Sequence, residues 1–330
     1  MTRGRHKTIL VTGAGGFIGS HVAERLLCQG HRVTAFVRYT STGNAGYLDG
    51  LDRRLTKNLT VVHGDIRNRD DIRRAASGTE IIIHLAAQIA IPYSYLSPGD
   101  FVEVNTVGTL NVLAAAREMP CRRIVHLSTS EVYGTAQYLP IDEKHPLTAQ
   151  SPYAASKIAA DKIVESFHRS FGLPAVIARP FNTYGPRQSP RAVIPTIIIQ
   201  ALRGTTIRLG NVEPRRDLSF VEDTADALVK IALSQKGIGG QFNIASGKDY
   251  TIAEVVEIIA DLLGKRLTIR TERRRVRPRS SEVAHLLGDR SLAAKTFRLK
   301  TPTLLRDGLA RTLSWFEANF DSIKREDYQR

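Results

Sequence analysis

Cysteine is scarce in this chain of 330 residues, which contains only Cys28 and Cys121. Two cysteines make no disulfide framework, so we expect a reducing compartment, the cytoplasm. No apolar run is long enough to cross a bilayer. The start, "MTRGRHKTILVTG", lacks the apolar segment and cleavage site of a secretory signal, so we expect neither a signal nor a membrane partner. Histidine and cysteine do not cluster with metal-ligand spacing, and we expect no metal.

Acidic residues are outnumbered by basic ones, and the net charge is +15. A basic balance attracts phosphates, and nucleic acid is one interpretation. The basic residues are spread along the chain, however, and the densest run is only "RTERRRVRPR". Because no recognisable nucleic-acid-binding module is present, we expect no nucleic acid partner. A small phosphorylated substrate accounts for the charge equally well.

Strand and helix patterns alternate over residues 1–180, which predicts an α/β dinucleotide-binding domain with a Rossmann-type doubly wound parallel sheet. Ser151 as N-cap, Pro152 at the first helical position and Gly172 after the end define one long helix. Beyond Pro180 the pattern loosens, which predicts a smaller α+β substrate lobe over 181–330, with part of 217–246 returning to the first domain. Strands are expected at 8–13, 32–38, 59–65, 80–87, 123–130, 174–180 and 240–246. Helices are expected at 17–30, 70–77, 101–118, 152–171, 192–204, 219–235, 251–264 and 304–320.

A glycine-rich loop, "VTGAGGFIG", follows the first expected strand and opens the first expected helix. Gly13, Gly16 and Gly19 permit a tight turn and a close approach of the backbone to a pyrophosphate at the helix N-terminus. A plain strand-helix turn is the alternative, but the position at the head of an alternating chain favours a dinucleotide. The expected cofactor site consists of Gly13, Gly16, Phe17, Ile18, Gly19, Arg38, Asp65, Ile66, Leu85, Ala86, Ala87, Tyr153, Lys157 and Pro180.

The end of the second strand bears on the choice between NAD and NADP. An acid about twenty residues after the glycine loop would hold the ribose 2′-hydroxyl of NAD. This chain has "FVRYTSTGN" there, with Arg38 in the place of the acid. A cation followed by hydroxyls suits a 2′-phosphate, so we favour NADP over NAD. An arginine stacked loosely on the adenine would still permit NAD. Asp65, at the end of the third strand, is expected near the adenine.

Tyr153 and Lys157 lie four residues apart on the expected helix and so share one face. A nearby ammonium lowers the pKa of a phenol, which could then act as a base toward a substrate hydroxyl. Thr129 follows the fifth strand, on the rim where the nicotinamide is expected. Taken with the glycine loop, these residues resemble the Ser/Thr-Tyr-Lys triad of the extended short-chain dehydrogenase/reductase superfamily.

The segment "STSEVYG" places Ser130 and Glu131 directly after Thr129. It resembles the Thr-Ser-Glu form of the GDP-mannose 4,6-dehydratases, a family of nucleotide-sugar 4,6-dehydratases. The resemblance implies that Glu131 removes the C5 proton of a 4-keto sugar. Ser130 or the protonated Glu131 would then help the C6 hydroxyl leave as water, and we favour Glu131 for both steps. The cofactor would stay bound and be recycled within each turnover.

Longer stretches, among them "HLAAQIAIPYSYLSP" and "ARPFNTYGPRQSPRAVIPTII", resemble the GDP-N-acetylglucosamine 4,6-dehydratases of legionaminic acid biosynthesis. The resemblance implies a GDP- or UDP-linked N-acetylglucosamine substrate, and a homodimer formed by helices 101–117 and 152–171 of both copies. The substrate-binding residues that it implies are Gln88, Asn182, Arg187, Arg191, Arg216 and Arg277. Arginine suits the diphosphate because its planar fork binds phosphate oxygens bidentately.

Three other functions remain open. A UDP-glucuronate decarboxylase also carries Ser-Thr-Ser-Glu-Val-Tyr-Gly, although its arginine for the uronate is not evident here. A 4-epimerase would leave Glu131 without a proton to move. A non-catalytic NADP-binding sensor would retain the fold without turnover. His84 and His126 lie in apolar strand patterns, and we interpret them as core histidines with satisfied hydrogen bonds.

Overall fold

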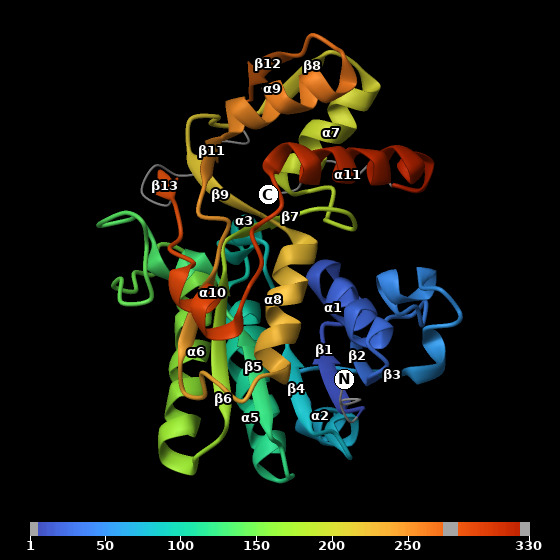
Figure 1. Ribbon diagram of the computed structural model, residues 1–330, viewed down its shortest axis with the longest axis vertical. Helices are drawn as coiled ribbons and strands as arrows, with labels where there is room; N and C mark the ends of the chain where they lie inside the picture. Colours follow the sequence, from blue (N-terminus) through green and yellow to red (C-terminus); the bar gives the residue numbers. More distant parts are fainter. Residues whose placement is uncertain (1–5, 273–282, 324–330) are drawn as a thin grey trace.

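A seven-stranded parallel sheet forms the centre of the larger of two parts in the computed structural model, which describes residues 6–272 and 283–323 (Figure 1). The strand order is β3-β2-β1-β4-β5-β6-β10, and every neighbouring pair is parallel. This is the doubly wound order of a Rossmann-type fold, so the predicted fold class is confirmed. The strands of this sheet are β1 (Thr8–Thr12), β2 (Arg32–Arg38), β3 (Leu59–Gly64), β4 (Ile81–His84), β5 (Arg123–Leu127), β6 (Ala175–Pro180) and β10 (Gln241–Ile244).

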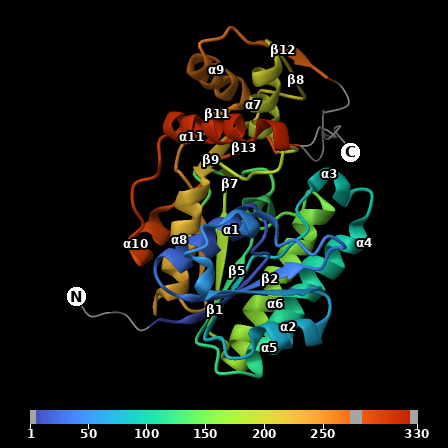
Figure 2. The ribbon, with the colours of Figure 1, turned by 90° about the vertical axis from the view of Figure 1, so that its right-hand side faces the viewer.

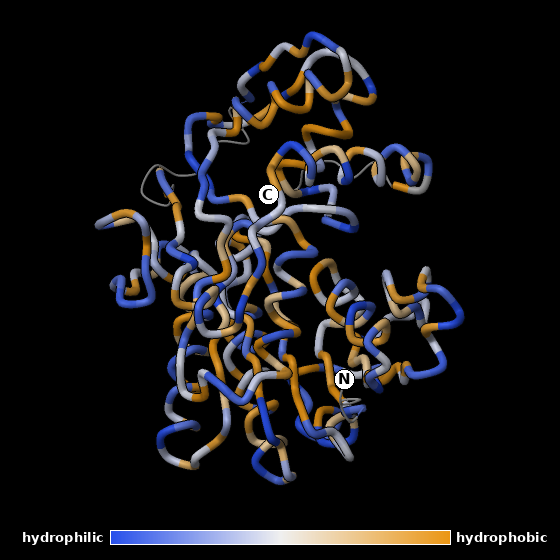
Figure 3. The backbone as a smooth tube through the Cα atoms, viewed as in Figure 1, coloured by the Kyte–Doolittle hydropathy of each residue, from blue (hydrophilic) through white to orange (hydrophobic). Residues whose placement is uncertain are grey.

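Helices cover both faces of the sheet (Figure 2). Successive strand residues point to opposite faces, so Ile9 and Val11 join the core under one helical layer while Leu10 joins the core under the other. The first layer contains α1 (Phe17–Cys28), α8 (Val221–Leu233) and α10 (Ser291–Phe297). The second contains α2 (Arg69–Ala76), α5 (Gly108–Arg117) and α6 (Pro152–Phe171). Figure 3 shows the hydrophobic segments gathered along the central strands.

Helix α6 begins and ends as predicted. The Ser151 side chain accepts a hydrogen bond from the backbone N–H of Ala154 at 3.1 Å. Pro152 occupies the first turn, and Gly172 ends the helix with a φ of 68°. The left-handed conformation at that position favours glycine because it has no Cβ.

The single helix predicted over residues 101–118 is interrupted. It consists of α4 (Pro98–Phe101), a π-helical segment η3 (Val102–Val107) and α5. Asn105, within the π-helical segment, is buried, and its side chain makes hydrogen bonds outside its own helix. Single π turns inside α-helices often lie at functional sites. The spacing of apolar residues along the sequence does not reveal them.

The smaller part lies above the sheet in Figure 1 and has its own core. Amphipathic helices pack there on short strands, and Ile197, Val255 and Phe316 are completely buried between them. The elements of this part are β7 (Asn182–Tyr184), α7 (Val193–Arg203), β8 (Thr206–Leu209), β9 (Arg215–Phe220), β11 (Asp249–Thr251), α9 (Ile252–Leu263), β12 (Thr268–Thr271), β13 (His285–Leu286) and α11 (Leu305–Ala318). The short elements η1 (Gly46–Gly50), η2 (Thr56–Asn58), α3 (Ile91–Ser94), η4 (Ser130–Tyr133) and η7 (Phe320–Ser322) complete the described chain.

The chain returns from the smaller part to the sheet. After β9 it forms α8, which packs on α1, and then β10, which pairs with β6 at the edge of the sheet. It then leaves again through β11 to α9. Residues from both halves of the sequence therefore build the large sheet and its first helical layer.

Candidate active site

The glycine loop connects β1 to α1 at the carboxyl ends of the strands. Gly13 has a φ of 68°, and a Cβ there would lie 2.8 Å from the backbone nitrogen of Ala86. A Cβ on Gly19 would lie 2.1 Å from the carbonyl oxygen of Gly13. Both positions therefore require glycine, the first for conformation and contact and the second for contact alone. Gly16, the N-cap of α1, is less crowded.

The N-terminus of α1 has the features of an anion site. Among the described residues no side chain caps this helix, and its first turn contains no acid. The first backbone N–H groups of a helix lack intrahelical partners and carry partial positive charge. Phe17 and Ile18 belong to this turn, directly after the crowded glycine loop. The loop and helix together fit the pyrophosphate of a dinucleotide.

A hollow lies at the ends of β2 and β3, where the adenosine of a dinucleotide would bind. Arg38 is exposed at its edge, as the last residue of β2. The Asp65 carboxylate, also at this hollow, is held by Arg67, with Nη2 to Oδ2 at 2.6 Å, and this bond lowers the pKa of Asp65. Asp65 is therefore engaged by Arg67, and it also lies close enough to Arg38 for that cation to lower its pKa. The residues that line the hollow are Arg38, Tyr39, His63, Gly64, Asp65 and Asp71.

The chain after β4 turns along the rim of the sheet. The strand ends at His84, earlier than predicted, because the Thr12 hydroxyl receives the N–H groups of Leu85 and Ala86 at 3.1 and 3.2 Å. Ala87 and Gln88 continue the rim. The Asn105 side chain clamps the backbone of Gln88, accepting from its N–H at 2.7 Å and donating to its carbonyl at 3.0 Å. Pro180 ends β6. Ile66, which follows β3, packs against Gly108, the first residue of α5.

The turn after β5 holds three of the predicted catalytic residues. Thr129 is the N-cap of η4, and its hydroxyl accepts the N–H of Glu131 at 3.2 Å. Ser130 is buried, whereas Glu131 is half-buried. The strand was expected to continue to residue 130 but ends at Leu127, because the chain coils into this short helix. The turn brings the Glu131 carboxylate close enough to Tyr153 for its charge to raise the pKa of that phenol.

Tyr153 and Lys157 are both almost completely buried on α6. The Tyr153 side chain is hydrogen bonded to Thr129, whereas no contact among the described residues joins it to Lys157. Lys157 Nζ donates to the carbonyl of Leu127 at 2.7 Å. Burial raises the pKa of Tyr153, and burial lowers the pKa of Lys157 to about 8. The expected lowering of the tyrosine pKa by Lys157 is not found, because Lys157 is not among the groups that act on this pKa and burial raises it. A base role for Tyr153 would therefore rely on the positive charge of an oxidised nicotinamide beside it.

The predicted substrate residues lie on several elements. Asn182, at the start of β7, has a buried side-chain oxygen with no hydrogen-bond partner among the described residues. Arg216 is buried in β9 and donates to the carbonyl of Arg215 at 3.0 Å. Arg191 is exposed, in the segment before α7. Arg277 lies outside the described residues.

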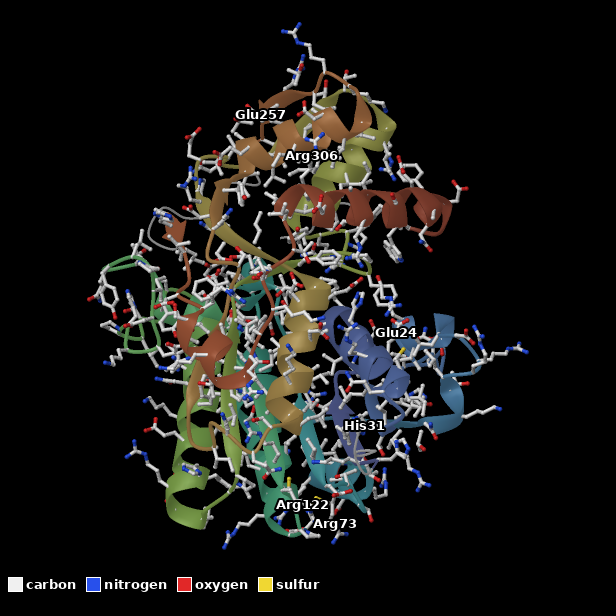
Figure 4. The ribbon with its side chains drawn as sticks, in the orientation of Figure 1. Glu24, His31, Arg73, Arg122, Glu257 and Arg306 are labelled. Atoms are coloured by element: carbon white, nitrogen blue, oxygen red, sulfur yellow. The ribbon has the colours of Figure 1, made fainter. Side chains whose placement is uncertain are left out.

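Arg187 points toward the cofactor helix. Its Nη2 lies 2.7 Å from the carboxylate of Glu24 on α1, which Figure 4 labels. Its φ of 67° is rare for a residue with a side chain, so the position is strained. In the structure Arg187 therefore links the segment after β7 to α1. Its predicted contact with the substrate diphosphate would require the ion pair with Glu24 to open.

The two strand histidines belong to the core, but only His84 has the satisfied hydrogen bonds that were expected, because both ring nitrogens of His126 are buried without a hydrogen-bond partner among the described residues. His84 is hydrogen bonded through both ring nitrogens, to Thr12 at 2.8 Å and to Thr109 at 3.0 Å. His126 lies 3.4 Å from a carboxylate oxygen of Asp161, and burial lowers the pKa of His126 to about 4. Within the described residues there is no group of three histidine, cysteine, aspartate or glutamate side chains placed to hold a metal. No described helix is both long and apolar enough to span a membrane.

Sequence reasoning missed the residues that support the site from behind. Asn105, Asp161 and Arg179 are buried and bond to residues on either side of the triad. Their partners lie between 17 and 51 residues away, so no local spacing could have indicated these contacts. The one indication of these residues in the sequence was a polar residue at a position where the helix or strand pattern predicts a buried apolar one.

The fold and the site are those of an enzyme of the extended short-chain dehydrogenase/reductase class. The family model described as GDP-mannose 4,6 dehydratase matches residues 10–312. The chain belongs to this family.

Relatives in the class include both dehydratases and epimerases. A dTDP-glucose 4,6-dehydratase of an Actinoplanes species is 33% identical over 94% of this chain and 98% of its own. A UDP-glucose 4-epimerase of Mycolicibacterium smegmatis is 34% identical over 93% and 97%. Among solved structures, the dTDP-glucose 4,6-dehydratase DesIV of Streptomyces venezuelae, determined with NAD bound, superposes with a TM-score of 0.86 at 30% identity, covering 96% of this chain and 99% of that one.

Proposed function

We propose that this protein is a nucleotide-sugar 4,6-dehydratase, a lyase that converts an NDP-hexose to the NDP-4-keto-6-deoxyhexose. The observation that carries the proposal is Glu131, a carboxylate on the turn that also holds Thr129, with its charge acting on Tyr153. A 4-epimerase needs only to oxidise and re-reduce C4, which gives such a carboxylate no proton to move. The family and the dehydratase relatives agree with this choice.

The side chains divide the proton transfers among them. When bound, the nicotinamide would accept a hydride from C4 of the sugar and return it to C6. Tyr153, hydrogen bonded to Thr129, takes the proton of the C4 hydroxyl. Glu131 removes the C5 proton, which the C4 ketone has made acidic, and passes it to the departing C6 hydroxyl, which leaves as water. When the hydride returns to C6, C5 takes up a proton that derives from solvent. Ser130 is buried beside this path and assists by hydrogen bonding.

The substrate is proposed to be GDP- or UDP-N-acetylglucosamine. Sequence likeness to the GDP-N-acetylglucosamine dehydratases supports the sugar. A buried acceptor on Asn182 without a partner supports a polar ligand, because unpaired buried polar atoms are costly. Arg216, Arg191 and the opened Arg187, together with Arg277, would bind the diphosphate.

The test is incubation of the purified protein with GDP-, UDP- and dTDP-linked glucose, N-acetylglucosamine and mannose in deuterated water, followed by mass spectrometry. We expect a product that has lost water and gained one deuterium at C5, and the best substrate identifies the nucleotide. A product that is an isomer of its substrate, with no loss of water, would instead establish the epimerase. Loss of carbon dioxide from UDP-glucuronate would establish the decarboxylase, and tight cofactor binding without turnover would establish the sensor.

The cofactor is proposed to be NADP rather than NAD, bound tightly and recycled. Arg38 is exposed at the adenosine hollow, and the nearby Asp65 is already paired with Arg67. Replacing Arg38 with alanine should weaken NADP binding roughly tenfold to a hundredfold, because a charge-assisted contact to the 2′-phosphate is lost. NAD binding should change little. Titration calorimetry with both cofactors measures the two affinities.

The control for this prediction is Arg32→Ala. Arg32 is exposed at the opposite end of the same strand, β2, so its loss removes a charge without touching the hollow. Equal weakening of NADP binding in both variants would contradict a specific role for Arg38. A preference of the wild-type protein for NAD would contradict the cofactor assignment itself.

We also propose a homodimer through η3, α5 and α6, in the cytoplasm. These helices pack side by side on one side of the molecule (Figure 2) and expose Val102, Val107, Leu110 and Phe171. Leu110→Glu should convert the dimer to monomer in sedimentation velocity, because it buries a charge in the contact. Leu292→Glu, on α10 in the other helical layer and similarly exposed, should remain dimeric. A monomeric wild-type protein would refute the proposal.

A further inference from the structure

A buried charged cluster lies behind the Tyr153–Lys157 pair and takes no part in the proton transfers. Its centre is Asp161, one helical turn after Lys157 on α6, with 1% of its surface exposed. Oδ2 of this carboxylate accepts from Arg179 Nε at 3.1 Å and Nη2 at 3.0 Å. The same oxygen accepts from the Ser128 hydroxyl at 2.9 Å. Three donors therefore fix the carboxylate and leave Oδ1 without a hydrogen bond among the described residues.

The cluster reaches both sides of the active site. Ser128 directly precedes Thr129, so one contact fixes the backbone that leads into the catalytic turn. Arg179 Nη1 donates to the Tyr133 hydroxyl at 3.1 Å, and Tyr133 donates in turn to Asn243 Oδ1 at 2.7 Å. Tyr133 is the last residue of η4, the helix that contains Glu131. A buried hydrogen-bonded chain thus runs from α6 to the turn and to β10.

We propose that Asp161, clamped by Arg179, is a positioning residue that holds the Lys157 ammonium in its charged form and thereby sets the alkaline limit of catalysis. Lys157 is 2% exposed, and its Nζ bonds to a neutral carbonyl, that of Leu127. A buried ammonium is unstable without a nearby negative charge. Asp161 is the carboxylate that acts on Lys157, and its charge raises the pKa of the lysine against the lowering by burial.

The other groups that face this pair cannot replace Asp161. From β5, His126 contacts Asp161 but stays neutral, because burial lowers its pKa to about 4. From β4, His84 is also neutral, since burial holds its pKa well below the usual value. From β6, Arg179 is a second cation, which Asp161 neutralises. From η4, the ionisable groups are Tyr133, whose pKa is raised by burial, and Glu131, which faces Tyr153. On α6 itself Tyr153 also faces the pair, and burial raises its pKa, so it stays neutral.

The direction of the pH effect follows from these contacts. Lys157 is charged below its pKa of about 8, so activity that needs the ammonium is present below that pH and is lost above it. Without the charge of Asp161 the pKa of Lys157 falls further. The alkaline limb of the pH–rate profile should therefore move to lower pH in Asp161→Asn, by roughly one pH unit or more.

Two measurements test this. The first is the pH dependence of cofactor reduction in a single turnover, with whichever sugar nucleotide the wild-type protein oxidises. Dehydratase, epimerase and decarboxylase all begin with this oxidation, so the inference rests on the proposed function only for that step. The second is a ¹³C NMR titration of the lysine Cε resonances, with Lys157 assigned by its loss in Lys157→Met. This readout requires no substrate, so failure of the proposed function is distinguishable from failure of the inference.

The matched control is Glu165→Gln. Glu165 lies one turn beyond Asp161 on the same helix, and it is paired at the surface with Lys162 and Arg169. Its removal should leave the rate and the pH profile unchanged. Asp161→Asn leaves Arg179 as an unpaired buried cation and could fail to fold. The double variant with Arg179→Gln removes both charges, so its limb should move in the same direction but less far than that of Asp161→Asn.

A lower rate at every pH with an unmoved alkaline limb, and an unmoved Lys157 titration, would overturn the proposal and leave the cluster a purely structural feature. Ser128→Ala separates charge from hydrogen bonding, because it removes one donor while the carboxylate remains. We expect its limb to stay at the wild-type pH. A limb that moved equally in Ser128→Ala and Asp161→Asn would also overturn the assignment.

Discussion

Glu131→Gln is expected to oxidise its substrate normally and then stop. Tyr153, Thr129 and Lys157 remain in place, so hydride leaves C4 of the sugar and reduced cofactor accumulates. Glutamine cannot take the C5 proton, so water is not eliminated and the hydride has no acceptor at C6. Because a positioned acid–base group contributes about 10²- to 10⁴-fold to a rate, kcat for dehydration should fall by at least about a hundredfold. Absorbance at 340 nm and product mass spectra follow the two half-reactions separately.

The comparison variant for this prediction is Ser130→Ala. Ser130 is buried beside Glu131 on the same turn, and we assign both the removal of the C5 proton and the protonation of the leaving hydroxyl to Glu131. Ser130→Ala should therefore retain most of the dehydration rate and accumulate little reduced cofactor. Normal dehydration by Glu131→Gln would show that the carboxylate is structural. A larger loss of dehydration rate in Ser130→Ala than in Glu131→Gln would instead assign protonation of the leaving hydroxyl to Ser130.

Tyr153→Phe is expected to block the reaction one step earlier. The phenylalanine ring still packs against Phe101, whose ring centroid lies 6.2 Å from that of Tyr153. Only the hydroxyl bonded to Thr129 is lost, and with it the group that takes the proton from the C4 hydroxyl. The rate of C4 oxidation should fall by about 10²- to 10⁴-fold, without accumulation of reduced cofactor. Single-turnover absorbance at 340 nm measures this directly.

The two variants are therefore distinguished by the state in which the cofactor is left. Tyr153→Phe should retain oxidised cofactor and unreacted substrate, and its thermal unfolding should match that of the wild-type protein. Tyr138→Phe is a matched control, since Tyr138 is exposed and its hydroxyl bonds only to Asp142 among the described contacts. Rapid cofactor reduction by Tyr153→Phe would remove the tyrosine from the base role.

Local patterns were sufficient to predict the sheet and most helices. Helix α6 carries its own N-cap and C-terminal glycine, and the strands of the sheet are short buried runs between turn residues. The glycine loop was predictable because a Cβ at Gly13 or Gly19 would clash with neighbouring backbone atoms, so these positions require glycine. The Thr129, Tyr153 and Lys157 set was predictable because the carboxyl ends of parallel strands meet at one edge of the sheet.

What the sequence did not reveal depends on contacts between distant segments. The π-helical turn around Asn105 preserves the apolar period on both sides, so the break is invisible in the pattern. The raised pKa of Tyr153 depends on how deeply the site is enclosed. The ion pair of Arg187 with Glu24 joins residues that no spacing rule connects.

The basic excess is not gathered at the site. Figure 4 places Arg73 and Arg122 at the end of the sheet away from the smaller part and Arg306 on α11 within it. Each of these arginines faces an acid, at 3.5, 3.7 and 3.5 Å respectively. The expectation of a small phosphorylated substrate therefore rests on the residues of the site, because these arginines lie away from it and are paired with acids.

The return of the chain to the sheet has a consequence for biosynthesis. During translation β6 is complete long before β10 emerges, because the chain between them contains β7, α7, β8, β9 and α8. Until then the β6 edge has unpaired backbone groups, and the apolar face under α8 is uncovered. The nascent chain therefore passes through an aggregation-prone stage that ends only when residues beyond 244 have left the ribosome. Because the chain crosses between the two parts more than once, we expect them to fold and unfold cooperatively.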